Sequence, residues 1–391
     1  MKRFLSGDEA VAEGVRLSRP KVISAYPITP QTMVVEKLSE MVETGLLDAE
    51  YMHVESEHSA LSAAMGASAT GVRTFTATSS QGLLYMAEVL SYSAGGRFPI
   101  VMMNANRSTA LPWNIYGDQR DSLSLLDHGW IQAYAENNQE ALDLTLMAYF
   151  IAENENVSTP FMLNLDGFAL THTYETVDIP TQEQADAFLP KYKTNNKFDF
   201  DSPVNMGYSA GPATNKFFKQ AEHVDMLKVF DVIDDAEKKF SEIFGRKYSG
   251  PIETYKCDDA DFIIVTLGSI AGLIRSVVDG MREKGEKVGL LKIRYMRPFP
   301  ANKIADALKN CKSFAVLEKD ISFGAEGTVF TNVKSALFDP QITKPALNFI
   351  GGLGGDDITI ENIIDIFNQI QRKADGEEIP TLNWLNVGGE Q

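Results

Sequence analysis

Cysteine is almost absent from this sequence, which has Cys257 and Cys311 as its only thiols in 391 residues. Iron–sulfur clusters are held by sets of thiolates, and structural zinc sites use closely spaced cysteine pairs. The sequence contains no CxxC pair. We therefore exclude a cysteine-held cluster or zinc site, and if the protein handles electrons, the carriers lie in another chain.

Long apolar runs and excess positive charge are also missing. No hydrophobic stretch reaches the ~20 residues that cross a bilayer. The N-terminal segment MKRFLSGDEA meets acid and glycine before the apolar core of a signal peptide develops. Lysine and arginine number 36 against 53 aspartates and glutamates, a net charge of -17. Because no signal peptide is expected, the protein should be cytoplasmic. Because such an acidic surface repels nucleic-acid phosphates and anionic lipids, we expect neither nucleic acid nor membrane as a partner.

Motifs for nucleotide binding and serine hydrolysis are absent too. The sequence has no P-loop and no GxSxG, and YPITP stands where a Rossmann fold needs its glycine fingerprint. The glycines of GGLGGDD (351–357) are followed by Asp356 and Asp357, which would repel a pyrophosphate. At GSIAG (268–272) we favour close helix packing over a weak anion site. A nicotinamide or flavin oxidoreductase is therefore disfavoured.

The sequence does contain an alternation of β-rich and helical segments. The first series of strands is expected at 22–26, 50–54, 73–79, 99–106, 130–136 and 160–166. The helices between them are expected at 31–44, 58–70, 81–95 and 138–153. Such an alternation predicts a parallel sheet with helices on both faces.

A second βα series follows an irregular segment that turns helical from about 214 to 244. Its strands are expected at 261–269, 287–295, 313–320 and 346–352, and its helices at 270–284, 301–309, 325–338 and 358–372. We therefore divide the chain into a first α/β domain (1–175), a connector (176–258) and a smaller α/β domain (259–391).

The loop YPITPQT (26–32) follows the first strand of the series, where the ligand of an open parallel sheet usually binds. Thr29 suits a helix N-cap and Pro30 suits the first helical position, so a plain helix start is one interpretation. The other is that the Thr29 hydroxyl and nearby N–H groups meet an anion at the helix N-terminus.

Two glutamates, Glu55 and Glu57, stand where the second strand meets a helix of small residues. Glu57 could simply open that helix, where the helix dipole favours an acid. His53, Glu55 and Glu57 would share one face of the strand if it ran through residue 57, and a metal site from these three residues and His58 is a weak alternative. A catalytic carboxylate is better motivated, because small side chains behind it let a flat ligand or another helix come close.

Arg107 follows the fourth strand, and its planar guanidinium suits recognition of a carboxylate. The alternative is a salt bridge to Asp118 or Asp121 in the same loop. The loop is long and carries Trp113 and Tyr116, so we expect it to act as a lid or an interface.

Several motifs in order along nearly the whole chain resemble the α subunit of 2-oxoacid:ferredoxin oxidoreductases, most closely the pyruvate:ferredoxin oxidoreductase (pyruvate synthase) type. They are YPITPQT, VESEHSA, TATSSQGL, NRS, DHGWIQAYAENNQEALD, LDGF, RPFP and GLGG. The resemblance implies a pyrimidine-type thiamine diphosphate-binding domain followed by a domain like the transketolase C-terminal domain.

The resemblance also implies roles for particular residues. Glu57 would hydrogen-bond N1′ of the cofactor's aminopyrimidine, with Glu55 a neighbour of open role. Thr29 and Arg107 would grip the carboxylate of the 2-oxoacid. The residues at the cofactor would be Pro27, Ile28, Thr29, Glu57 and Ser80.

Partners are implied by what the chain lacks relative to the family. The GDG…N motif for diphosphate and Mg²⁺ is missing, since DGF at 166–168 lacks the first glycine and the asparagine. The β subunit would supply it, β and δ subunits would carry 4Fe–4S clusters, and a γ subunit would complete the complex. The reaction would convert pyruvate and coenzyme A to acetyl-CoA and CO₂ and reduce ferredoxin, reversibly.

Alternatives remain at two levels. The alternative substrate to pyruvate is 2-oxoisovalerate or another branched or aromatic 2-oxoacid, whereas the neutral Thr29 disfavours a substrate with a second carboxylate, such as 2-oxoglutarate. A subunit of another class, a non-catalytic scaffold, would show no loss of activity on changing Glu57.

Overall fold

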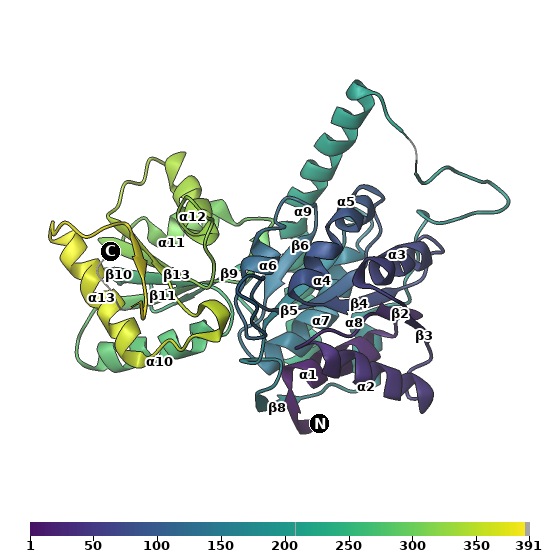
Figure 1. The fold of residues 1–391 in the computed structure, drawn as a ribbon, viewed down its shortest axis with the longest axis horizontal. Coiled ribbons are helices and arrows are strands. Elements are labelled where there is room, and N and C mark those ends of the chain that lie inside the picture. The colour runs from purple at the N-terminus through teal and green to yellow at the C-terminus, as the bar shows by residue number, and fades with distance from the viewer. Residues whose placement is uncertain (208, 388–391) are drawn as a thin grey trace.

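The computed structural model describes residues 1–207 and 209–387 and places two sheets side by side along the longest axis (Figure 1). The first is a seven-stranded sheet in the order β12-β6-β7-β5-β4-β2-β3. Its strands are β2 (Val22–Ala25), β3 (Glu50–His53), β4 (Thr74–Thr78), β5 (Val101–Asn106), β6 (Ile131–Tyr134), β7 (Phe161–Asp166) and β12 (Tyr295–Arg297). All pair in parallel except β12, which runs antiparallel to β6. The six strands predicted for the first series are confirmed.

Helices cover both faces of this sheet, so its central strands are buried throughout. The helices are α1 (Gly7–Ser18), α2 (Thr32–Glu43), α3 (Glu57–Ser68), α4 (Ser80–Tyr85), α5 (Ala87–Gly95), α6 (Arg120–Leu123) and α7 (Asn138–Ala152). One hydrophobic cluster joins α1, α2 and α7 to one face of the sheet, and another joins α3, α4 and α5 to the other face. Burial on both faces explains why β5 and β7 are nearly continuous apolar runs.

The N-terminal elements were not predicted. β1 (Lys2–Ser6) pairs with β8 (Tyr174–Asp178) in a separate antiparallel ribbon, and α1 follows directly. Ser6 and Glu9 form a capping box at the start of α1, a signal that the sequence carried. The single helix expected at 81–95 is wrong, because it divides into α4 and α5 at Met86.

The second sheet is six-stranded, in the order β15-β14-β13-β10-β11-β9. Its strands are β9 (Ile252–Tyr255), β10 (Phe262–Thr266), β11 (Val288–Ile293), β13 (Ser313–Glu318), β14 (Ala346–Ile350) and β15 (Leu382–Trp384). Its helices are α10 (Ile270–Glu283), α11 (Ala301–Leu308), α12 (Thr328–Phe338) and α13 (Ile360–Ala374). The four predicted strands and four predicted helices are confirmed, whereas the edge strands β9 and β15 were missed.

Between the two series lie α8 (Gln182–Phe188) and the 33-residue helix α9 (Pro212–Phe244). The predicted helix at 214–244 is thereby confirmed. Proline at the first turn starts α9, and Gly245, with φ 70°, ends it. The N-terminal end of α9 extends away from both sheets (Figure 1). None of the helices formed by described residues is long and apolar enough to cross a membrane.

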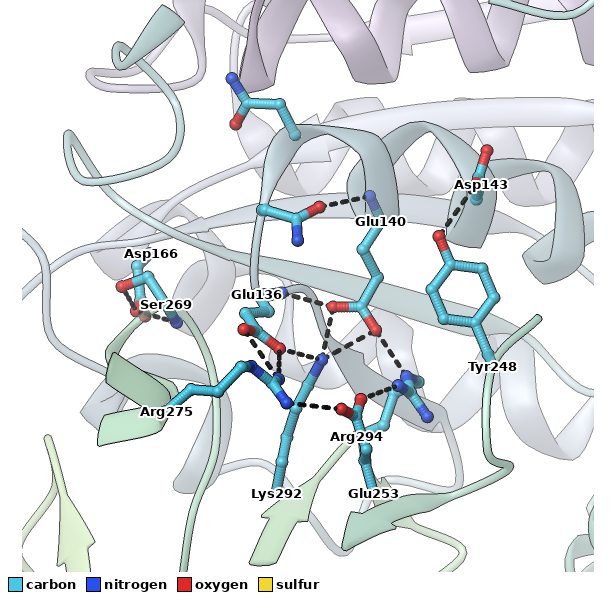
Figure 2. A network of polar contacts seen from close by, with 12 residues as sticks. Glu136, Glu140, Asp143, Asp166, Tyr248, Glu253, Ser269, Arg275, Lys292 and Arg294 are labelled. Carbon is cyan, nitrogen blue, oxygen red and sulfur yellow. Dashed lines mark hydrogen bonds and ion pairs between the residues drawn. The ribbon is translucent and has the colours of Figure 1, made fainter. Parts of the chain in front are cut away.

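A buried ionic network joins the two sheets (Figure 2). Lys292 Nζ lies 2.7 Å from Glu140 Oε2 and 2.8 Å from Glu136 Oε2, and Arg294 Nε lies 2.5 Å from Glu140 Oε1. Arg275 of α10 bridges Glu136 and Glu253. Glu136 and Glu140 belong to the first α/β unit and the cations to the second, so the network fixes the two units against each other.

Candidate active site

The loops after β2, β4 and β5 meet at the carboxyl edge of the first sheet, where hydrogen bonds from Arg107 tie them together. Arg107 Nη1 donates to the Thr29 carbonyl oxygen at 2.8 Å. Arg107 Nη2 donates to Gln81 Oε1 at 2.9 Å. The structure therefore brings Thr29 and Arg107 together and adds Gln81, which the sequence did not single out.

Glu57 is the first residue of α3, as one interpretation predicted, and it approaches the same loops. A Cβ atom added to Gly82 would lie 2.7 Å from Glu57 Oε1, so the carboxylate packs directly on the glycine. Glu57 is half-buried, and no hydrogen bond or ion pair from another described residue reaches its carboxylate. Its charge does act on Arg107, where it favours the protonated guanidinium.

The other acid and the two histidines around Glu57 point elsewhere. β3 ends at His53, so the condition for a shared face of His53, Glu55 and Glu57, a strand that runs through residue 57, is not met. Glu55 is exposed, and the hydrogen bond from Ser59 lowers the pKa of its carboxyl. His58 Nε2 lies 3.4 Å from Glu88 Oε2. In the part of the chain that the structure describes, no group of three or more histidine, cysteine, aspartate or glutamate side chains could hold a metal ion.

The loop that carries Thr29 is not the helix start that the sequence suggested. α2 begins at Thr32 after Gln31, so the prediction of Thr29 as N-cap with Pro30 at the first helical position is wrong. Gln31 instead closes a turn, its amide side chain donating to the Tyr26 carbonyl at 2.8 Å and its N–H to the Ile28 carbonyl at 3.0 Å. The turn keeps Pro27 and Thr29 exposed and Ile28 half-buried at the rim.

The alternative interpretation of Arg107, a salt bridge to Asp118 or Asp121, is wrong. Asp118 pairs with Arg120 at 2.7 Å, and Asp121 accepts the backbone N–H of Arg107 at 3.1 Å. Arg107 is 5% exposed, and its Nε finds no hydrogen-bond acceptor among the described residues. Burial lowers the pKa of Arg107, while Asp121 and Glu57 oppose that shift. The result is a buried cation with an unused donor, which an anionic ligand would satisfy.

Asp121 organises this edge of the sheet, a role that sequence reasoning missed. Its carboxylate accepts the N–H groups of Ser80 and Arg107, each at 3.1 Å, and the side-chain amides of Asn104 and Asn106 at 3.2 and 2.8 Å. Burial raises the pKa of Asp121 to about 6. Asparagines within an otherwise apolar buried strand were the available signal, since such groups need partners.

Ser80 lies one layer behind the rim. It is fully buried at φ 50°, a left-handed conformation that few residues other than glycine adopt. Its hydroxyl lies 2.7 Å from both the Ser108 carbonyl and Gln81 Oε1. Ser80 therefore positions Gln81, which in turn holds Arg107.

The long loop after β5 forms an interface with the second α/β unit. Asn114 Nδ2 donates to the Gly354 carbonyl, and Gly355 N–H donates to the Gly117 carbonyl, both at 2.9 Å. Tyr116 packs so closely on Gly355 that an added Cβ would lie 2.5 Å away. The GGLGG segment thus packs against the loop.

The GSIAG turn packs against the first α/β unit in the same region. Ser269 N–H at the start of α10 donates to Asp166 Oδ2 at 2.9 Å, and the Ser269 hydroxyl bonds the same oxygen (Figure 2). Lys319 Nζ lies 3.1 Å from that carboxylate. The helix N-terminus therefore meets an anion of its own chain.

Comparisons with known families decide the affiliation of the chain. The family described as "Pyruvate flavodoxin/ferredoxin oxidoreductase, thiamine diphosphate-binding" matches residues 13–238. The family described as "Pyruvate:ferredoxin oxidoreductase core domain II" matches residues 260–363. The chain belongs to the pyruvate:ferredoxin oxidoreductase family. The resemblance inferred from the sequence motifs is thereby confirmed, and the family is one of oxidoreductases.

Relatives within this family match over almost their whole length. Pyruvate synthase subunit PorA of Methanothermobacter thermautotrophicus is 45% identical over 99% of both chains. The PorA subunit of Pyrococcus horikoshii is 47% identical over 100% of this chain and 99% of its own. Ketoisovalerate oxidoreductase subunit VorA of the same organism is 43% identical over 99% of this chain and 98% of its own.

Solved structures show the same fold at lower identity. A 2-oxoglutarate:ferredoxin oxidoreductase from Magnetococcus marinus superposes with a TM-score of 0.73 at 21% identity, covering 95% of this chain and 65% of that chain. A split-gene transketolase superposes with a TM-score of 0.53 at 10% identity, covering 95% of this chain and 96% of that chain. The predicted α/β class with a transketolase-like arrangement is confirmed.

Proposed function

We propose that this chain is the α subunit of a coenzyme A-dependent pyruvate:ferredoxin oxidoreductase, active with partner subunits. The reaction is the reversible conversion of pyruvate and coenzyme A to acetyl-CoA and CO₂ with reduction of ferredoxin. The observation that carries the proposal is the Glu57 carboxylate, free of hydrogen bonds among the described residues and set on Gly82 beside Arg107. Four PorA relatives at 45–47% identity support pyruvate as the substrate.

A second substrate is favoured by one observation. The VorA subunit of Pyrococcus horikoshii is 43% identical to this chain, against 47% for the PorA subunit of the same organism. The difference in identity is small, so 2-oxoisovalerate is the second candidate, with the same chemistry at the same residues.

The residues at the rim fit thiamine diphosphate on two observations. The Glu57 carboxylate has no partner among the described residues and so can meet a ring nitrogen, and Gly82, which lacks a side chain, lets that carboxylate pack directly on α4. When bound, thiamine diphosphate supplies the electron sink that makes loss of CO₂ from a 2-oxoacid feasible. Pro27, Ile28 and Thr29 would line the ring, and Ser80 would act from behind by fixing Gln81.

Residues of this chain carry out proton transfer to the cofactor and orient the substrate. Glu57 holds or releases a proton at N1′ of the aminopyrimidine, which acts as general acid–base catalysis. Arg107 and Thr29 orient the substrate carboxylate, and the Nε–H of Arg107, buried and without an acceptor among the described residues, would be one donor to it.

The diphosphate and the electrons require other chains in this proposal. The GDG…N motif is absent from the sequence, and so are cluster-forming cysteines. A β subunit would bind the diphosphate and Mg²⁺, β and δ subunits would carry 4Fe–4S clusters, and a γ subunit would complete the assembly. The names of the relatives as subunits support such an assembly.

The test compares Glu57→Gln with Glu55→Gln in the assembled complex. Glu57→Gln should lower pyruvate-dependent ferredoxin reduction by about 10²–10⁴-fold, because general acid–base catalysis contributes about that factor. It should equally slow hydrogen–deuterium exchange at C2 of the bound cofactor, measured by NMR, while the subunits still co-purify. Glu55→Gln removes an exposed neighbour and should leave both rates unchanged. Normal turnover in Glu57→Gln would instead support a scaffold subunit.

A further inference from the structure

One face of the N-terminal half of α9 is exposed along its length. Residues 212–220 are all exposed, and this end of the helix stands clear of both sheets (Figure 1). Contacts with α5, α7 and α8 hold the rest of α9 against the first α/β unit. Because short helical segments are only marginally stable in water, this end of α9 would gain stability from a partner surface.

Five exposed residues on α9 form a seam with heptad spacing. They are Ala213, Phe217, Gln220, Val224 and Leu227. Their spacing alternates between four and three residues, as in positions a and d of a coiled coil. Phe217, Val224 and Leu227 are 64%, 45% and 52% exposed. This set, the α9 seam, extends about 21 Å along the helix axis, since each residue rises by about 1.5 Å.

The residues that flank the α9 seam include basic side chains and no acid. The flanking positions hold Thr214, Lys216, Ala221, His223 and Lys228. Lys216 makes no hydrogen bond or ion pair with another described residue, and Lys228 pairs only within the helix, with Asp225 at 2.8 Å.

The acids of this half of α9 face the body of the molecule instead. Asp225 pairs with Arg97, and Glu222 Oε1 would lie 3.6 Å from a Cβ added to Gly95 of α5. As far as Lys228, this half of the helix therefore has its acids toward its own fold and its bases beside the outward seam, and the exposed Asp231 ends the seam at the next heptad position after Leu227. In a coiled coil, flanking charges of this kind select the partner helix.

We propose that the α9 seam is a docking site for an amphipathic helix of a partner protein, with apolar residues at heptad spacing flanked by aspartate and glutamate. A second copy of this chain fits less well, because pairing two α9 helices would oppose basic flanks to basic flanks. The proposal is independent of the catalytic assignment, since the seam contributes nothing to the Glu57 site.

The test uses the full chain and two fluorescent synthetic helical peptides that share one leucine seam. One peptide carries glutamate at every flanking position and the other carries lysine. In fluorescence anisotropy at low salt, the glutamate peptide should bind at least ~10-fold more tightly than the lysine peptide. Leu227→Asp should abolish that binding, while Leu46→Asp, at an exposed leucine far along the sequence, should not. Circular dichroism should show both variants folded.

Four results would overturn the proposal. The first is equal binding of the two peptides, and the second is undiminished binding by Leu227→Asp. The third is self-association of the wild-type chain in sedimentation that Leu227→Asp abolishes, which would make a second copy the occupant. In the native assembly, a photo-crosslinker at Phe217 should attach to a helix with acidic flanks in another subunit, and attachment to a second copy or to a non-helical segment would also refute it.

Discussion

At the scale of single residues, the site depends on which group caps α3. The Ser56 hydroxyl accepts the Ser59 N–H at 3.2 Å and satisfies the helix N-terminus. Ser56, and not Glu57, therefore caps the helix, so the Glu57 carboxylate can lie at the rim of the site.

Arg107 gives the prediction that separates binding from chemistry. Its guanidinium bonds Thr29 and Gln81 and keeps Nε–H free of partners among the described residues, so truncation removes a charge-assisted contact to the substrate carboxylate. We expect Arg107→Ala in the complex to raise KM for pyruvate by about 10–100-fold, as hydrogen bonds to charged groups contribute about 1.5–3 kcal/mol. Arg107→Lys should recover part of this loss. Steady-state kinetics would contradict the role if KM stayed constant while kcat fell.

At the scale of elements, the site exists because α3 and α4 approach closely. The approach is possible where Gly82 of α4 meets Glu57 of α3 and Thr78 at the end of β4. A Cβ at this position would lie 2.7 Å from an oxygen of each side chain, so any larger residue has to move the carboxylate. The small residues of α3 and the glycine of α4 thus both allow the two helices to pack closely.

Gly82→Ala tests whether the site needs this close packing of α3 and α4, and Gly66→Ala is its control. Gly66 is an exposed glycine inside α3 with no atom within 4 Å of an added Cβ. Gly66→Ala should raise the free energy of unfolding by about 1 kcal/mol through helix propensity and leave turnover unchanged. Gly82→Ala should lower turnover at least tenfold without a matching loss of stability. Both are measured by urea unfolding of the chain and by activity of the complex, and full activity of Gly82→Ala would refute the close approach.

At the scale of the whole molecule, the ionic network sets the position of the second α/β unit. Lys292 and Arg294 are almost fully buried, as is Glu140, so each charge depends on its partners. Such networks add little net stability compared with apolar packing, but losing one member leaves a buried charge uncompensated. The network therefore acts mainly on the arrangement of the two α/β units. Because GGLGG packs on the loop after β5, this arrangement also affects the residues around the candidate site.

Lys292→Met tests how strongly the folded state depends on the ionic network. The change leaves Glu136 and Glu140 without their shared lysine, and we expect the free energy of unfolding to fall by about 3–5 kcal/mol. The matched control is Arg372→Met, which breaks an exposed ion pair with Glu377 and should leave the urea midpoint unchanged. Equal midpoints for the two variants would show that the network is not a determinant of stability.

The same network predicts a dependence of stability on pH. Burial tends to raise the pKa of Glu140, but Lys292 and Arg294 outweigh it and hold the pKa at about 2, below the usual value of 4.5. Because the folded-state pKa is lower than that of the unfolded chain, the stabilisation is present above about pH 4.5 and is lost as the pH falls toward 2. Urea unfolding between pH 7 and pH 3 should show this loss, and Glu140→Gln should flatten that part of the profile.

The sequence by itself determined the fold class and the family. Apolar runs with intervening helical periodicity specify βα units locally, and the six strands of the first series appeared as expected. Motifs such as YPITPQT and VESEHSA identified the family because their order along the chain is linear information. Glu57 was placed correctly at a helix start, since the capping preference of Ser56 is local as well.

Only the tertiary structure decided which side chains meet. Asp121 was considered as a partner for the Arg107 guanidinium, yet it binds backbone N–H groups and two asparagines of β5. Thr29 was considered as the N-cap of a helix, but α2 begins only at Thr32, because the Gln31 side chain closes a turn over the preceding residues. Edge strands such as β9 and β15 form only when a neighbouring strand is present to pair with them. Hydrogen bonds between distant segments depend on the assembled sheet, so spacing along the chain cannot specify them.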